Sequence, residues 1–364
     1  MSTEKTVRLG IIGLGTMGNI HARNILEGRA SGLTLAAIAD ADEARLSVFS
    51  ESVAKFTDST TMMDSGQVEA VLIATPHFSH TPLGIAALER NLHVLVEKPI
   101  SVHKADCEKL IRAHTNPDLV FGAVFNQRCT PHYRKLRELI QSGQLGEIQR
   151  VNWTITDWYR TDTYYRMGSW RATWKGEGGG VLLNQCPHNL DLLQWLFGMP
   201  KKLTAICQFG RHHDIEVEDD VTAMLEFANG ATGVFVTSTG EAPGVNRLEV
   251  ACDRGLIIIE GEKFQFTRTE KLVSEHLRQS THGFDRPEKW HIDIPHQAGA
   301  NGHVAILTNF ANAILHGEPL IAPAAEGIHS VELANAMLYS TFKSQPVVLP
   351  LDGQAYEAEL VARY

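Results

Sequence analysis

The first 125 residues alternate between short apolar runs and segments with polar and apolar residues at helical spacing. The clearest apolar runs are VRLGII, LTLAAIAD, VEAVLIATP and LHVLVEKP, and the segment LGIAALERN separates the last two. Runs of this length between turn residues are typical of buried strands. Strands that alternate with helices predict a parallel sheet with helices on both faces. We therefore predict a doubly wound Rossmann-type α/β domain over residues 1–125.

A glycine-rich turn directly follows the first predicted strand. Its spacing is Gly13-x-Gly15-x-x-Gly18, and a helix is expected to start within it. Gly13 permits the sharp turn, Gly15 lets backbone amides approach a pyrophosphate, and Gly18 lets the helix pack closely. The helix N-terminus then faces the anion. The pattern predicts a dinucleotide site that includes Thr16 and Met17.

The second predicted strand ends at Asp40, about twenty residues beyond the last glycine. A carboxylate at this point accepts hydrogen bonds from both ribose hydroxyls and repels a 2′-phosphate. Ala41, Asp42 and Glu43 follow it and offer no guanidinium. The sequence therefore favours NAD over NADP. The alternative is that Asp40 caps a helix over the segment ADEARLSVF.

Two further groups stand at the carboxyl ends of predicted strands, where ligands bind on doubly wound sheets. One is Thr75-Pro76, and the other is Glu97-Lys98 before a proline. All four residues are expected to contact the cofactor, with Lys98 near its reactive end. The alternative for Lys98 is a surface lysine that ends a strand.

The second part of the chain carries polar residues within the apolar segment GGGVLLNQCPHNLDLL. Asn184, His188 and Asp191 are four and then three residues apart, so on a helix they share one face. Pro187 is tolerated there only if the helix begins near Asn184, which puts the proline in the first turn. The alternative for His188 is a core histidine tied to a neighbouring carboxylate.

Aromatic and basic residues interleave over residues 151–180, which hold four of the six tryptophans. Aromatic faces suit the C–H side of a sugar ring, and arginine or indole N–H groups suit its hydroxyls. We take Trp170, Arg171 and Trp174 as candidate substrate contacts. The alternative for each aromatic residue is packing in a sheet or an interface.

Composition narrows the class of protein. The 364 residues suggest two domains. A net charge of −9 argues against a nucleic-acid partner, and no apolar run is long enough for a membrane helix. Five scattered cysteines indicate neither a disulfide framework nor a zinc site, so we expect a reducing cytoplasm. The 17 histidines form no convincing ligand set, and no metal is expected.

Several of these segments together resemble the Gfo/Idh/MocA oxidoreductases, the family of glucose-fructose oxidoreductase and inositol dehydrogenase. They are GIIGLGTMGNIH, ATPHFSHTPLGIAAL, HVLVEKPIS, GEGGGVLLNQCPHNLDLLQWL and HVAILTNFANAILHGEPLIAPAAEGIHSVELANAMLYS, so the resemblance covers nearly the whole chain. It implies a second α/β domain, residues 126–364, with a large open, mostly antiparallel sheet. This domain carries the substrate site and often the oligomer contact, and its C-terminal helices can cover the first domain.

The resemblance also implies hydride transfer between a nicotinamide and a secondary alcohol of a sugar, inositol or related polyol. The family's lysine, aspartate and histidine at the reacting carbon fall on Lys98, Asn184 and His188. Asn184 departs from the pattern, because an amide cannot take a proton at neutral pH, so we assign it substrate positioning. The resemblance further implies that His80 and Asn126 lie near the cofactor.

We expect His188 to be the general base, oriented by Asp191, and Lys98 to supply a cation at the substrate oxygen. Lys98 as the base is the alternative. Two other functions stay open: a glycosidase that recycles bound NAD through oxidation and elimination, and a dinucleotide-binding regulator without activity. A homo-oligomer, either a dimer or a tetramer, is expected because a large open sheet face needs covering.

Overall fold

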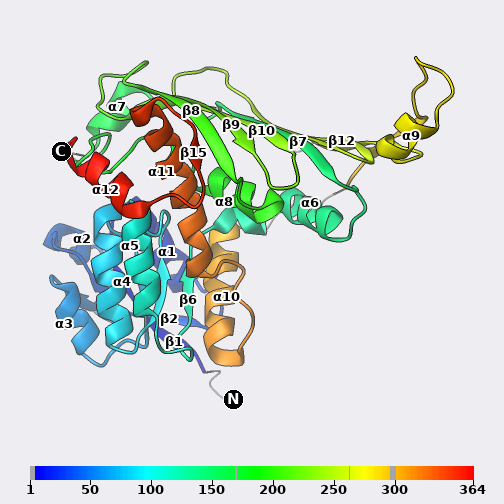
Figure 1. Cartoon of the computed structure of the whole chain (residues 1–364). Coiled ribbons are helices and arrows are strands. Elements are labelled where there is room, and N and C mark those ends of the chain that lie inside the picture. Colours follow the sequence, from blue (N-terminus) through cyan, green and yellow to red (C-terminus); the bar gives the residue numbers. More distant parts are fainter. Residues whose placement is uncertain (1–4, 169, 262, 296–300) are drawn as a thin grey trace.

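The computed structural model describes residues 5–168, 170–261, 263–295 and 301–364. Two sheets organise the chain, and helices fill the space between and around them (Figure 1). The six-stranded sheet has the order β3-β2-β1-β4-β5-β6, and the nine-stranded sheet has the order β14-β13-β12-β11-β7-β10-β9-β8-β15. The predicted fold class is confirmed.

The six-stranded sheet is parallel throughout and is the predicted doubly wound sheet. Its strands are β1 (Val7–Ile12), β2 (Leu33–Ala39), β3 (Ala54–Phe56), β4 (Ala70–Ile73), β5 (His93–Val96) and β6 (Phe121–Ala123). Its helices are α1 (Thr16–Leu26), α2 (Glu43–Ser47), α3 (Ser59–Asp64), α4 (His80–Glu89) and α5 (Lys104–Ala113), with short 3-10 turns η1 (His77–Ser79) and η2 (Asn126–Cys129). Strands β1 and β4 are almost wholly buried, which explains their continuous apolar runs.

A helix from the far end of the chain completes this domain. Helix α10 (Gly302–His316) packs against α1, β1 and β2, and it buries Ile306 and Phe310 in the same core as the parallel sheet. The segment around Ala322 pairs with the edge strand β6, where the Ala123 N–H donates to the Ala322 carbonyl at 2.9 Å. Residues 302–322 therefore cover and extend a sheet whose strands all lie within residues 7–123.

The nine-stranded sheet is antiparallel except where β7 and β10 pair in parallel. Its strands are β7 (Ile148–Ile155), β8 (Lys202–Phe209), β9 (Glu218–Glu226), β10 (Thr232–Ser238), β11 (Asn246–Cys252), β12 (Gly255–Glu260), β13 (Lys263–Thr269), β14 (Lys289–Asp293) and β15 (Val347–Val348). The accompanying helices are α6 (Pro131–Gln141), α7 (Asp162–Arg166), α8 (Pro187–Phe197), α9 (Val273–Gln279), α11 (Gly327–Lys343) and α12 (Gly353–Val361), with a 3-10 turn η3 (Ala324–Glu326).

The two faces of this sheet differ. Along β8, Leu203 and Ala205 point inward, while Ile206 points to solvent. Helices α8 and α11 lie on the inner face, between this sheet and the parallel sheet (Figure 1). On the outer face, Ile206 is 63% exposed and Met224 is 65% exposed. In the part of the chain that the structure describes, no helix is both long and apolar enough to cross a bilayer.

The start of α8 differs from the prediction by three residues. The helix begins at Pro187, which occupies its first turn, and Asn184 lies in the turn before it. The Asn184 N–H donates to the Gly180 carbonyl at 2.9 Å. Asn184, His188 and Asp191 therefore do not form one helical face, because a separate turn orients Asn184.

Candidate functional site

A cavity of about 900 Å³ opens where the carboxyl ends of the parallel strands meet the turn that precedes α8. It runs from the glycine-rich turn to Asn184. Most of the predicted site residues line it: Gly13, Gly15, Thr16, Met17, Asp40, Thr75, Pro76, His80, Glu97, Lys98, Trp170, Arg171 and Asn184.

The glycine-rich turn has the shape that a pyrophosphate requires. Gly13 has a φ of 91°, a conformation that favours glycine. A Cβ on Gly18 would lie 1.9 Å from the Gly13 carbonyl oxygen, so α1 packs against the turn only because Gly18 has no side chain. Helix α1 begins at Thr16, and no side chain caps its first N–H groups. These N–H groups would be available to a pyrophosphate of the cofactor.

Asp40 closes the other end of this turn. Its Oδ2 accepts from the Leu14 N–H at 2.7 Å, and its Oδ1 accepts from the Asp42 N–H at 2.9 Å. Asp42, not Asp40, is the residue that caps α2. Sequence reasoning missed Arg45, which also lines the cavity and places its Nη1 3.4 Å from Asp40 Oδ2. Arg45 lies two residues beyond Glu43 in sequence, in α2.

His80 braces the loops that carry Thr75 and Lys98. It is the first residue of α4, it is buried, and its ring nitrogens lie 2.8 Å from the carbonyl oxygens of Thr75 and Pro99. Burial lowers the pKa of His80. The imidazole thus holds the cavity wall in shape.

Glu97 and Lys98 directly follow β5 and line the cavity; Glu97 is buried and Lys98 is half-buried. Burial works to raise the pKa of Glu97, but His21, with Nε2 2.7 Å from Glu97 Oε1, and Lys98 bring this pKa down to about 2. Lys98 Nζ donates to the main-chain oxygen of Asn184 at 2.9 Å. Burial lowers the pKa of Lys98, and the negative charges of Glu97 and Glu177 oppose that effect.

His188 lies in the first turn of α8. It is 8% exposed, and its ring meets the Phe125 ring edge-on at 6.2 Å between centroids. Burial and the charge of Lys98 hold the pKa of His188 well below its ordinary value, so the imidazole is unprotonated at neutral pH. Its Nδ1 has no hydrogen-bond partner among the described residues, and His188 is not one of the residues that line the cavity.

Asp191 does not orient His188. Both of its carboxylate oxygens accept from Arg128, Oδ1 at 2.6 Å from Nη2 and Oδ2 at 2.8 Å from Nε. The two side chains are each 1% exposed. The predicted role of Asp191 in orienting His188 is wrong, because the buried Arg128 guanidinium from η2 binds both carboxylate oxygens.

Two other predicted contacts lie away from the cavity. The Trp174 indole is buried between Phe209 and Phe342, at 5.6 and 5.8 Å between ring centroids, because it fills the core below the nine-stranded sheet. Asn126 faces α10 instead, and its Nδ2 lies 3.4 Å from His303 Nδ1. Neither of the two lines the cavity.

Glu177 and Tyr164 are the main residues of the site that sequence reasoning missed. Glu177 is 1% exposed and its Oε1 accepts from the Asn184 side-chain amide in a short hydrogen bond. Tyr164 donates to Asn184 Oδ1 at 3.4 Å and accepts from Arg171 Nη1 at 2.9 Å. A carboxylate inside a glycine run was the available signal for Glu177.

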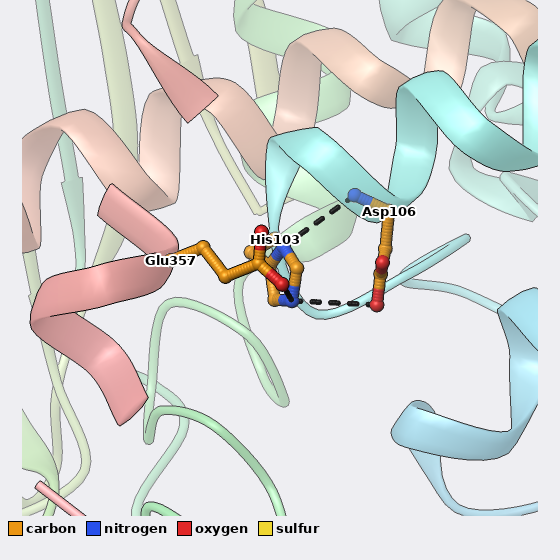
Figure 2. Close-up of side chains that lie close together, drawn as sticks. All are labelled: His103, Asp106 and Glu357. Carbon is orange, nitrogen blue, oxygen red and sulfur yellow. Dashed lines mark hydrogen bonds and ion pairs between the residues drawn. The ribbon is translucent and has the colours of Figure 1, made fainter. Parts of the chain in front are cut away.

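Outside the cavity, His103, Asp106 and Glu357 form a group with metal-ligand side chains (Figure 2). His103 Nδ1 accepts from the Asp106 N–H at the start of α5, so Nε2 carries the hydrogen. That Nε2 lies 3.3 Å from Asp106 Oδ2 and 3.7 Å from Glu357 Oε1. Lys109 Nζ also donates to Asp106, at 2.7 Å. The arrangement is an ion-paired contact between α5 and α12.

Two family models match the chain. Residues 7–124 match the oxidoreductase family with an NAD-binding Rossmann fold, and residues 133–258 match the GFO/IDH/MocA C-terminal domain.

Relatives cover most of the chain. It is 27% identical over 265 residues to a myo-inositol 2-dehydrogenase of Thermotoga maritima, covering 70% of this chain and 75% of that protein. It is 32% identical over 270 residues to inositol 2-dehydrogenase 4 of Saccharopolyspora erythraea, covering 71% and 75%. The fold matches the WlbA dehydrogenase of Bordetella pertussis, solved with NADH and UDP-GlcNAcA, with a TM-score of 0.80, 23% identity and coverage of 96% and 100%. The chain therefore belongs to the Gfo/Idh/MocA family of oxidoreductases, and its residues 7–124 form an NAD-binding Rossmann fold.

Proposed function

We propose that this protein is an NAD-dependent dehydrogenase that oxidises a secondary hydroxyl of a sugar, glycoside or inositol. One observation carries the proposal. A single cavity joins the glycine-rich turn and Asp40, which suit a dinucleotide, to the polar end formed by Lys98, Arg171 and Asn184. The inositol dehydrogenases among the relatives agree with a polyol substrate.

In this proposal His188 removes the proton of the substrate hydroxyl, and Lys98 stabilises negative charge on its oxygen. NAD, when bound, supplies the hydride acceptor. Lys98 places a positive charge in the cavity wall, which favours alkoxide character on the substrate oxygen. We assign the hydroxyl proton to His188, which is unprotonated. Because His188 does not line the cavity, this role requires its ring to become accessible from the cavity. Lys98 as the base remains the alternative, since burial also lowers its pKa.

The polar end of the cavity suits a polyhydroxylated ring. Arg171 lies with its guanidinium carbon 4.6 Å from the Trp170 ring centroid, so an aromatic face and several N–H donors are adjacent. Asn184 adds an amide next to Lys98. These residues orient the ring and its hydroxyls, and no carboxylate stands at the position of Asn184.

The assembly and the compartment are also part of the proposal. The outer face of the nine-stranded sheet exposes Ile206 and Met224, and we assign this face to a second copy in a dimer or tetramer. The five cysteines are free, which fits a reducing cytoplasm.

The test is the appearance of reduced nicotinamide when the protein meets NAD or NADP and a panel of free sugars, alkyl and aryl glycosides, anhydrosugars and inositols. Net reduction of NAD, with little reduction of NADP, supports the proposal. Release of aglycone without net reduction overturns it in favour of a glycosidase that recycles bound NAD. Bound NAD with neither product overturns it in favour of a regulator.

A further inference from the structure

Glu177 is a buried carboxyl group whose two oxygens both face hydrogen-bond donors. It lies in the turn before α8, between Gly176 and Gly178. Its Oε2 accepts from the Ala172 N–H at 2.7 Å, and its Oε1 accepts from the side-chain Nδ2 of Asn184. The carboxyl group is not in the cavity wall, so it acts on a ligand only through a neighbour.

Asn184 is that neighbour, and it is held at each of its polar groups. Its side chain lines the cavity. Its amide nitrogen is directed at Glu177, and its amide oxygen accepts from Tyr164. Its main-chain oxygen accepts from Lys98 Nζ at 2.9 Å. The amide therefore lies between the buried carboxyl group of Glu177 and the part of the cavity that Lys98 and Arg171 line.

We propose that Glu177 is a positioning residue whose protonation state decides which end of the Asn184 amide faces the cavity. An ionised carboxylate only accepts hydrogen bonds, so it holds the amide NH₂ and leaves the amide oxygen to accept from a ligand hydroxyl. A protonated carboxyl donates its O–H to the amide oxygen, and the NH₂ then turns to the cavity as a donor. The substrate side of this inference rests on the proposed polyol dehydrogenase.

The surroundings of Glu177 bring this change into the neutral range. Burial raises the pKa of Glu177 to about 7, against the hydrogen bonds from Ala172 and Asn184 and the charges of Arg171 and Lys98. The other titratable groups that face it are Glu218, Tyr165 and His77. The pH thus decides, through Glu177, whether the neutral amide of Asn184 offers an acceptor or a donor to the cavity.

The amide of Asn184 can be observed directly, without any catalytic assay. The protein is labelled with ¹⁵N-asparagine and saturated with NADH, and the Asn184 side-chain signal is identified by its loss in Asn184→Asp. We expect the signal to move with pH with a midpoint near 7 in the native protein and to be insensitive to pH in this range in Glu177→Gln. Glu216→Gln is the matched control, because Glu216 accepts from the N–H of Trp174, a residue of the loop that carries Glu177. In this variant the Asn184 signal should move with pH as it does in the native protein.

A signal that does not move with pH in the native protein overturns the inference, whether or not Glu177→Gln folds. An unchanged titration in Glu177→Gln also overturns it, since another group then turns the amide. If Glu177→Gln does not fold, Glu177→Asp replaces it, and the shorter acid should weaken the response of Asn184. A protein that shows the expected titration yet reduces NAD with no polyol of the panel supports this inference and overturns the proposed function.

Discussion

The Arg128 guanidinium holds both carboxylate oxygens of Asp191, at 2.6 and 2.8 Å, in a fully buried pair. Arg128 Nη1 also donates to Glu326 of η3. The pair connects η2, α8 and the turn that precedes α11. Asp191 is therefore part of the architecture that positions α8, and His188 is presented by the helix without help from this carboxylate.

Asp191→Ala removes the buried counter-charge of the Arg128 guanidinium and leaves only the partly exposed carboxylate of Glu326 beside it. We expect the free energy of unfolding to fall by about 3–5 kcal/mol, measured by urea denaturation. Gln194→Ala, which removes only a donor to Asp191 at 3.2 Å, should cost about 1 kcal/mol. Unchanged stability in Asp191→Ala, together with a shifted pH profile of turnover, would return Asp191 to the role of orienting His188.

His188→Ala removes the proposed proton acceptor. We expect turnover to fall by about 10²–10⁴-fold, while the affinity for NADH, followed by fluorescence, stays close to that of the native protein. His291→Ala is a matched control, because His291 lies on β14 and pairs with Thr267. Native turnover in His188→Ala would transfer the base to Lys98.

Burial and, after it, the charge of Lys98 lower the pKa of His188, and Lys98→Met removes the second of these effects. The pKa of His188 then rises toward its ordinary value, because the attraction of Glu97 remains. Since the base must be unprotonated, the acidic limb of the kcat/KM profile should move to higher pH. The pH dependence of kcat/KM for the best substrate of the panel measures this. A profile of reduced height in an unmoved position would contradict the coupling between the two residues.

Asp40→Ser tests what selects the cofactor. In the native protein Arg45 Nη1 lies 3.4 Å from Asp40 Oδ2. Removing the carboxylate frees Arg45 to bind a 2′-phosphate. We expect the ratio of NADP to NAD affinity to rise by about tenfold or more, measured by fluorescence titration of the two reduced cofactors. The gain should vanish in the double variant Asp40→Ser/Arg45→Ala. If the double variant keeps the gain, repulsion by Asp40 alone accounts for the preference.

Glu218 makes stability depend on pH. Burial raises the pKa of Glu218 to about 7 in the folded protein. A carboxyl whose pKa is raised on folding binds its proton more tightly in the folded state. Its contribution to stability is therefore fully present below the ordinary pKa of 4.5 and is lost as the pH rises through about 7.

Glu218→Gln should lose part of that dependence. We expect the decrease in unfolding free energy between pH 5 and pH 8 to shrink by up to about 3 kcal/mol, measured by urea denaturation at both values. Glu89→Gln, at an exposed carboxyl at the end of α4, should leave the decrease unchanged. An equal decrease in Glu218→Gln and the native protein would show that Glu218 is ionised in the fold at both pH values.

Local sequence patterns were enough to predict the parallel sheet, the glycine-rich turn and the strand ends at Asp40 and Lys98. Each of these depends on a period or a spacing within a few residues, and on the rule that parallel strands present their carboxyl ends at one edge. The open, mostly antiparallel sheet was expected from the family resemblance and not from a local pattern.

The partners of buried polar groups were decided only by the tertiary structure. Asp191 and Arg128 are 63 residues apart, so no local pattern pairs them. Trp174 reads as a sugar contact in sequence but lies in the core. The turn between Gly180 and Pro187, rather than a helix, aims Asn184 at Glu177. Periodicity specifies which face of an element is buried, whereas long-range packing specifies which group each buried side chain meets.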